Sequence, residues 1–387
     1  VQDAYLDNRI VDSNQSYSQW STTSNLLQSV EAQFAEPGVN GLSNTLDGFW
    51  NSWRELAASP DGLSSRVALV AKANSLAERV QEIYTNINDL RAQLDVTVSN
   101  RIDEINRISG DIAEVNEKIV NLEVTGAAPN DLLDRRDSLV GDLSKIVAVR
   151  SHGTGGRDFI LNVGGVTLVQ GINARPIVGQ TDSEGHIQPV WADDQSAVGI
   201  SSGELRGTLN VRDSFIPEYL DQLDTIATTL VEKVNALHSS GYTMNGDTGQ
   251  DFFVAGTTAR NLALDPALLA DPSLVATSAN GEQSNSEIAQ AIADLSNGKL
   301  IGNETISQNY RTLVSKIGGD VGIAERSATT REFTLQQLTK QRDAVSGVSI
   351  DDEMVDMVRY QQAFSASARV FEATNSVLDT LMQAVGG

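Results

Sequence analysis

Residues 76–122 have the sequence LAERVQEIYTNINDLRAQLDVTVSNRIDEINRISGDIAEVNEKIVNL. Apolar side chains recur in it at alternating steps of three and four residues, which places them along one face of an α-helix. One strict heptad runs from Leu76 to Leu94 and a second runs from Ile105 to Leu122. Between the two heptads the register shifts in a way that resembles the stutter of a coiled coil. The stretch therefore predicts one long helix with a change of register in its middle.

Turn-forming sequences on either side set the limits of this helix. SPDG at 59–62 precedes it and TGAAPN at 125–130 follows it. A helix over residues 66–122 is about 85 Å long at 1.5 Å per residue. Helical spacing also covers most of the other residues before position 148. We therefore predict that residues 1–147 are the N-terminal part of a helical bundle whose apolar seams pack against one another.

The character of the sequence changes at residue 148. Short alternating runs such as FILNV (159–163) and VTLVQ (166–170) are separated by Gly-Gly, the pattern of strands joined by a tight turn. We predict a β-rich outer domain of about four to six strands over residues 148–204. Residues 254–283 are ambiguous, and they could join this domain as edge strands.

Helical spacing returns after the β-rich segment. Residues 205–240 are predicted to form a helix that returns to the bundle, with Pro217 either kinking it or beginning a new helix. Residues 284–345 supply the C-terminal part of the bundle. The predicted fold class is mainly α with an inserted β domain. Long helices from discontinuous N- and C-terminal segments form the bundle or coiled coil, and a small β-rich domain interrupts them.

Residues 346–387 are predicted to form a terminal amphipathic helix that mediates assembly. Its seam advances at steps of three and four through Met354, Met357, Gln361, Phe364, Ala368, Phe371, Asn375, Leu378 and Met382. Two amides interrupt the apolar character of the seam. Gln361 and Asn375 could set the register in which the helix meets a partner, because a buried amide penalises misaligned partners. Simple exposure at the edge of a bundle is an equal alternative, and the sequence leaves both interpretations open.

The composition argues against nucleic-acid and membrane partners. With 28 basic and 51 acidic side chains, the chain has a net charge of −23, whereas nucleic acids and anionic membranes attract basic surfaces. The chain contains no cysteine, which excludes disulfides and cysteine-based metal sites. The sequence shows no apolar run long enough to span a bilayer and no signal peptide at its start.

Residues that could support catalysis are scarce. His152, His186 and His238 lie far apart in the sequence and form no metal-binding pair. GISSG (199–203) matches the G-x-S-x-G pattern of a serine hydrolase with Ser201 as the nucleophile, but that mechanism needs a large, mostly parallel sheet. A glycine-flanked turn that leaves the β-rich domain is the simpler interpretation. We therefore predict no catalytic residue, no metal site and no cofactor.

The chain resembles the bacterial flagellar hook-associated FlgK family in four segments. These are PNDLLDRRDSLVGDLSKIV (129–147), GELRGTLNVRDSFIPEYLDQLDTIATTLVEKVNALHSSGYTMNGDTGQDFF (203–253), LALDPALLADPSLVA (262–276) and VSGVSIDDEMVDMVRYQQAFSASARVFEATNSVLDTLM (345–382). The last segment is shared in looser form by rod, hook and hook-associated axial proteins. The resemblance implies an N-terminal inner-helix segment in the family, and we expect that segment to be missing from these residues.

This resemblance implies a structural role in the flagellum. FlgK-like proteins form the junction between the flexible hook and the filament. They are exported without a cleaved signal through the flagellar type III apparatus, after a chaperone has bound the C-terminal helix. The implied partners are other subunits of the same protein, the hook protein, the adjoining filament-side junction protein and the export chaperone, and the implied location is the extracellular flagellum.

The resulting functional hypothesis is a structural subunit of the hook–filament junction that assembles through its helical terminal regions. A secreted coiled-coil adhesin of similar shape is the alternative from another class. A serine hydrolase that uses Ser201 is a further alternative.

Overall fold

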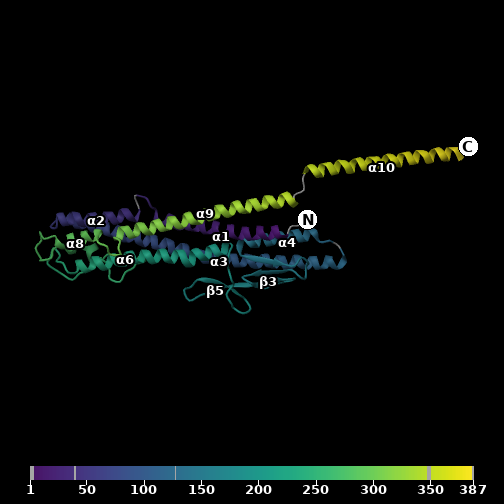
Figure 1. Cartoon of the computed structure of the whole chain (residues 1–387). Coiled ribbons are helices and arrows are strands. Elements are labelled where there is room, and N and C mark those ends of the chain that lie inside the picture. Colours follow the sequence, from purple (N-terminus) through teal and green to yellow (C-terminus); the bar gives the residue numbers. More distant parts are fainter. Residues whose placement is uncertain (1–3, 39–40, 127, 347–349, 386–387) are drawn as a thin grey trace. The chain divides into compact units, whose positions relative to one another are not determined.

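A computed structural model describes residues 4–38, 41–126, 128–346 and 350–385 of the chain. The chain divides into two compact units. The first unit combines Val1–Ile10 with Gln336–Gly387, and the second comprises Val11–Leu335. Figure 1 labels the helices and strands in the order in which they follow one another along the chain.

Long helices make up most of the described chain, which confirms the predicted fold class. The helices are α1 (Ala4–Phe34), α2 (Leu42–Ala58), α3 (Leu63–Thr125), α4 (Asn130–Ile146), α5 (Glu204–Asn210), α6 (Ile216–His238), α7 (Pro266–Ala270), α8 (Glu287–Asp294), α9 (Ile306–Ser346) and α10 (Ile350–Val385). The predicted long helix is α3, which runs unbroken through 63 residues. Its left-handed C-cap, Gly126, ends it within the predicted TGAAPN turn.

The predicted β-rich segment contains short antiparallel strands. They are β1 (Val149–His152), β2 (Ile160–Val163), β3 (Val166–Gln170), β4 (Asn173–Ala174), β5 (Ile177–Thr181) and β6 (Ile187–Trp191). β1 to β4 form one sheet in sequence order, and β5 pairs with β6 in a separate ladder. Both groups lie against the side of α3, with which β3, β4, β5 and β6 make contacts (Figure 1).

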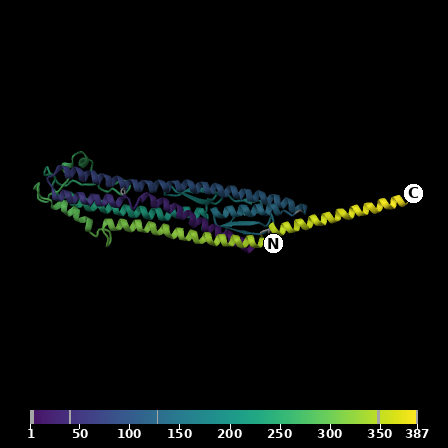
Figure 2. The same cartoon turned by 90° about the horizontal axis from the view of Figure 1, so that it is seen from above.

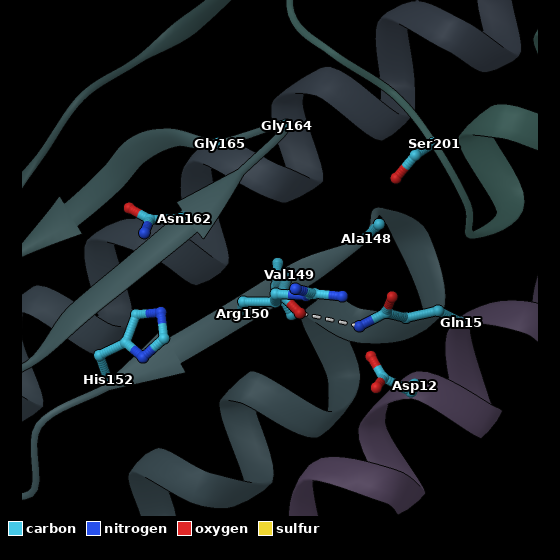
Figure 3. Close-up of a pocket in the computed structure, with 10 residues that line it drawn as sticks. All are labelled: Asp12, Gln15, Ala148, Val149, Arg150, His152, Asn162, Gly164, Gly165 and Ser201. Atoms are coloured by element: carbon cyan, nitrogen blue, oxygen red, sulfur yellow. Dashed lines mark hydrogen bonds between the residues drawn. The ribbon is translucent and has the colours of Figure 1, made fainter.

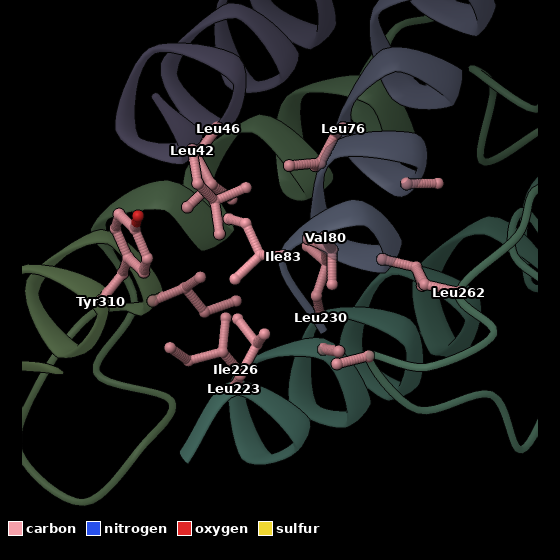
Figure 4. Close-up of a cluster of buried hydrophobic side chains, with 14 of the residues drawn as sticks. Leu42, Leu46, Leu76, Val80, Ile83, Leu223, Ile226, Leu230, Leu262 and Tyr310 are labelled. Atoms are coloured by element: carbon pink, nitrogen blue, oxygen red, sulfur yellow. The ribbon is translucent and has the colours of Figure 1, made fainter. Parts of the chain in front are cut away.

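The first half of α3 belongs to one hydrophobic core. Apolar side chains from Leu69 to Leu94 pack there with side chains of α2, α6, α8 and α9. Figure 4 shows the centre of this core, which Leu76, Val80 and Ile83 of α3 share with Leu46 of α2 and Leu223 of α6. Leu76, Val80 and Ile83 follow one another at steps of four and three, which places all three on the face of α3 that enters this core.

The second half of α3 belongs to a different core. Apolar side chains from Val98 to Ile119 pack with side chains of α4 and of the strands. The boundary between the two cores lies between Leu94 and Val98, at the predicted change of register. Two consecutive steps of four, from Leu94 to Val98 and on to Ile102, turn the apolar stripe around the helix. The stutter therefore lets one helix present its apolar face first to α2, α6, α8 and α9 and then to α4 and the strands.

Pro217 lies in the first turn of a helix, as the second of its two predicted roles requires, and no loop separates that helix from α5. A π-helical turn, Val211–Phe215, joins α5 directly to α6, and Pro217 lies in the first turn of α6. Proline has no N–H with which to continue the i→i−4 pattern. The chain instead closes an i→i−5 hydrogen bond from the N–H of Ile216 to the carbonyl of Val211. The wider turn keeps the helix continuous.

Residues 254–283 do not extend the β-rich domain. Their buried side chains, among them Leu262, Leu264 and Val275, belong to the core of α2, α6 and the first half of α3. The backbone of this segment makes isolated bridges, Phe253 with Leu264 and Tyr242 with Ser278. The edge-strand interpretation fails because the apolar side chains of the segment are buried at the helical core.

Candidate assembly surface

The predicted assembly seam lies on one helix, α10. All nine predicted residues fall between Ile350 and Val385, and every side chain from Met354 to Met382 is exposed. Phe364 is 78% exposed and Phe371 is 74% exposed. An extended row of exposed large apolar side chains is typical of a surface that binds another protein. Whether this row is an assembly seam stays a prediction.

A second apolar stripe on α10 escaped the sequence analysis. Val370, Val377 and Leu381 follow one another at steps of seven and four, and each is more than half exposed. These residues lie on a different stripe from Phe371 and Leu378, because each valine precedes one of those residues by one position, which is a turn of about 100° around an α-helix. The regular spacing of the two valines and the leucine was the signal that could have revealed the stripe. A helix with two apolar faces suits two neighbours.

Ser201 lies in a hollow of about 460 Å³. Asp12, Arg150 and His152 also line the hollow, and Figure 3 shows Ser201 and His152 on different sides of it, with Arg150 between them. The backbone around Ser201 serves a packing role. A Cβ on Gly164 would lie 2.5 Å from the carbonyl oxygen of Gly199, so the first glycine of GISSG meets another glycine. These observations favour the glycine-flanked turn over a nucleophile elbow.

His238 is not available as a base for Ser201. Its ring is buried in the helical core against Trp53 and Phe252. The N–H of Ala276 donates to Nε2 at 2.9 Å, so Nδ1 carries the proton and donates to the carbonyl of Gln250 at 2.7 Å. Burial is the main cause that lowers the pKa of His238, to about 4. The ring is therefore a neutral clamp that holds two loop segments to the end of α6.

Three buried arginines hold the fold together, and none of them was predicted. Arg66 binds the carbonyls of Val275 and Pro60 and the hydroxyl of Thr277. Arg136 plays a corresponding role at the second core, and Arg212 binds Asp95, Asp213 and the carbonyl of Ile187. The signal was present in the sequence, because each arginine occupies a position of an apolar helical seam. A charged residue on such a seam must find polar acceptors inside the fold.

Arg136 fixes the loop between β1 and β2. Its guanidinium donates to the carbonyls of Thr154 and Gly155 and to the side chain of Asn116. The guanidinium carbon lies 4.1 Å from the centre of the Phe159 ring, a distance at which a cation and an aromatic face attract each other. Arg136 thereby ties the loop to α3 and α4.

Within the described ranges, no group of three or more His, Cys, Asp or Glu side chains is arranged to hold a metal ion. Among the helices of those same ranges, none combines the length and apolar character that crossing a bilayer requires.

Comparison with known proteins identifies the family. The family model described as "Flagellar hook-associated protein FlgK helical domain" matches residues 27–253, which is more than half of the chain. The chain belongs to the flagellar hook-associated protein FlgK family. A second family model, "Flagellar basal body rod FlgEFG protein C-terminal", matches residues 341–384 and so covers most of α10.

Relatives of this FlgK-family chain come from distant bacteria. Flagellar hook-associated protein 1 of Salmonella typhimurium is 26% identical, over 98% of this chain and 87% of that protein. Flagellar hook-associated protein 1 of Bacillus subtilis is 24% identical, over 100% of this chain and 84% of that protein. The structure of the flagellar hook junction protein FlgK from Burkholderia pseudomallei covers 88% of this chain and 100% of that chain, with a TM-score of 0.78 and 14% identity. At this identity the structural likeness shows a shared fold.

Proposed function

We propose that this chain is a structural subunit of the bacterial flagellum that joins the hook to the filament. Membership of the FlgK family carries the proposal. Relatives that match nearly the whole chain are named for association with the hook. The exposed apolar row on α10 supports it physically, because a subunit of a continuous structure must leave surfaces for its neighbours.

The terminal helix is the part of the chain proposed to assemble. Its seam, from Met354 to Met382, would be buried against other copies of this chain, the hook protein and the filament-side junction protein. Before assembly the same row would be covered by an export chaperone, since exposed rows of this kind otherwise promote aggregation. In this proposal the protein acts outside the cell, on the flagellum, and it acts by binding rather than by catalysis.

The experiment uses a strain from which the corresponding gene is deleted. We expect hooks without filaments in that strain, with unpolymerised filament protein in the medium, and restoration of filaments by the wild-type gene. Electron microscopy with an antibody against residues 148–204 should then label a short zone between hook and filament. Filaments that still grow on hooks in the deletion strain would exclude the junction role.

Two alternative functions are tested in the same strain. Ser201→Ala should leave filament assembly unchanged, because Ser201 lies on an exposed turn remote from α10 in the sequence. Loss of an esterase activity in that variant, with swimming retained, would favour the hydrolase. Loss of host-surface attachment in the deletion strain, with normal filaments, would favour the adhesin.

A further inference from the structure

One face of α9 carries a hollow with unpaired positive charge. Its lining residues are Ile323, Arg326, Ser327, Thr330, Arg331 and Thr334, and its volume is about 320 Å³. Ile323 is 51% exposed, and Phe333 beside the hollow is 68% exposed. In the described part of the chain, neither the Arg326 nor the Arg331 guanidinium has a hydrogen-bond acceptor or an acidic partner. We call these seven residues the α9 stripe.

The charge of α9 is unusual for this chain. The helix contains six basic and four acidic residues, within a chain whose net charge is −23. The hollow itself is lined by two arginines and by no carboxylate. Arginine and aromatic residues around a depression are typical of the energetic centre of a protein interface. The surface that fits the α9 stripe is therefore acidic, with an apolar side chain at its centre.

A surface of this kind lies on α3. Asp89, Val96 and Asp103 follow one another at intervals of seven residues, and all three are exposed. Val96 is 61% exposed, and within the described residues neither aspartate has an ion-pair partner. At 1.5 Å per residue, each carboxylate lies about 10 Å from Val96 along the helix axis. We call these three residues the α3 stripe.

The two stripes cannot meet within one copy of the chain. In Figure 2, α3 runs along one long side of the helical unit Val11–Leu335 and α9 along the other. A contact between two different surfaces of identical subunits repeats from copy to copy and closes into a ring when the rotation permits. We infer that the α9 stripe of one copy binds the α3 stripe of a second copy, with Val96 entering the hollow between Arg326 and Arg331.

This inference rests on the proposed function, since a junction built from many copies needs a repeating contact. It also explains how strongly acidic subunits can lie side by side. Two chains of net charge −23 repel each other, so a lateral contact is favoured where basic residues of one copy face carboxylates of the next. The α9 stripe supplies two unpaired arginines for that purpose.

Disulfide trapping tests the contact directly, because these 387 residues contain no cysteine. A chain with both Val96→Cys and Thr330→Cys is produced in the deletion strain, and isolated hook–filament complexes are oxidised. We expect a ladder of covalent multimers, and monomers alone from each single variant. The control chain combines Thr330→Cys with Gly110→Cys, an open position on α3 that lies about 21 Å from Val96 along the helix. It should give at least about tenfold less ladder, since a disulfide needs Cα atoms within about 7 Å.

Exchanging the charges of the two stripes is a second test of the contact. Arg326→Glu with Arg331→Glu should lower the yield of the ladder by at least about tenfold, because like charges then face each other. Adding Asp89→Arg and Asp103→Arg to the same chain should restore it. The control pair Arg54→Glu and Arg311→Glu makes the same change of net charge at exposed positions outside the stripe, and it should leave the ladder intact. Normal filaments without a ladder would overturn the inference and leave the junction role standing, whereas filaments in the deletion strain would overturn the junction role.

Discussion

The Nη1 atom of Arg212, in the π-helical turn, lies 2.7 Å from the Oδ1 atom of Asp95, at the change of register in α3. Arg212 is fully buried. The same carboxylate accepts hydrogen bonds from the ring of His186 and from the N–H of Ile187. Burial by itself would raise the pKa of Asp95, but these hydrogen bonds and the charge of Arg212 lower it. One carboxylate thus joins α3, the π-turn and the β5–β6 hairpin.

Removal of Arg212 should therefore be costly. Arg212→Met is expected to lower the free energy of unfolding by about 3 to 5 kcal/mol, because it leaves the carboxylate of Asp95 short of its main cationic partner. Urea unfolding followed by circular dichroism measures the change. Arg107→Met removes an exposed partner of Asp111 and should cost less than about 1 kcal/mol. Equal costs for the two variants would contradict a structural role for the Arg212 cluster.

The neutral ring of His238 should make the fold sensitive to mild acid. The pKa is lowered from 6.5 to about 4 in the folded chain, so the unfolded chain binds a proton first as the pH falls. The free energy of unfolding should therefore decline between pH 6.5 and about pH 4, by about 3 kcal/mol in total. Urea midpoints measured from pH 7.5 to pH 5 check the onset of this decline, above the range in which most carboxylates titrate.

Two glutamine variants isolate the contribution of His238. His238→Gln should flatten the decline between pH 6.5 and pH 5, since glutamine does not titrate. His152→Gln replaces an exposed histidine and should keep the decline of the wild type. A slope that persists unchanged in His238→Gln would show that other groups cause the acid sensitivity.

The contact of Gly164 with Gly199 should tolerate no side chain. Gly164→Ala places a Cβ 2.5 Å from the Gly199 oxygen at a φ of +57°. Gly165→Ala is the matched control, because its φ is +83° and nothing lies within 4 Å of its Cβ. The control should cost about 1 to 2 kcal/mol for the left-handed backbone alone, and Gly164→Ala should cost clearly more. Thermal unfolding of the two variants measures the loss of stability in each. Equal losses would show that the close approach of Gly164 to Gly199 does not exclude a side chain.

Two exposed apolar residues on opposite faces of α10 test the position of the seam. Phe371 belongs to the predicted seam, whereas Val355 lies about 160° around the helix from it, and both are more than half exposed. Phe371→Ser should abolish or strongly reduce filament formation, since a buried aromatic residue in an interface contributes about 2 kcal/mol or more. Val355→Ser should leave filaments nearly normal in number. Filament counts per cell in the complemented deletion strain measure both, and the reverse order of effects would place the seam on another face.

Local spacing predicted a large part of this fold. The steps between Leu76 and Leu122 predicted one long helix, and the structure has it as α3. The stutter predicted a change of register, and the two cores meet there. These features depend on interactions between residues three or four positions apart. The spacing of such residues can be read from the sequence alone.

Other features depended on contacts between distant parts of the chain. The ambiguity of residues 254–283 was resolved only by their burial against α2, α3 and α6. The continuity of the helix through Pro217 depended on a π-turn that the sequence pattern does not distinguish from a kink. Both choices reflect which neighbours are present in space, and propensity is too weak to decide them.

The sequence by itself determined the helices, the place of the β insert, the apolar row on α10 and, through its motifs, the family. Only the tertiary structure decided what the buried charges bind. Arg66 stands on an apolar seam of α3, yet its acceptor Thr277 lies 211 positions further along the chain. A buried guanidinium must be satisfied wherever the fold brings polar atoms to it. That requirement fixes the kind of partner, and the path of the whole chain determines which residue supplies it.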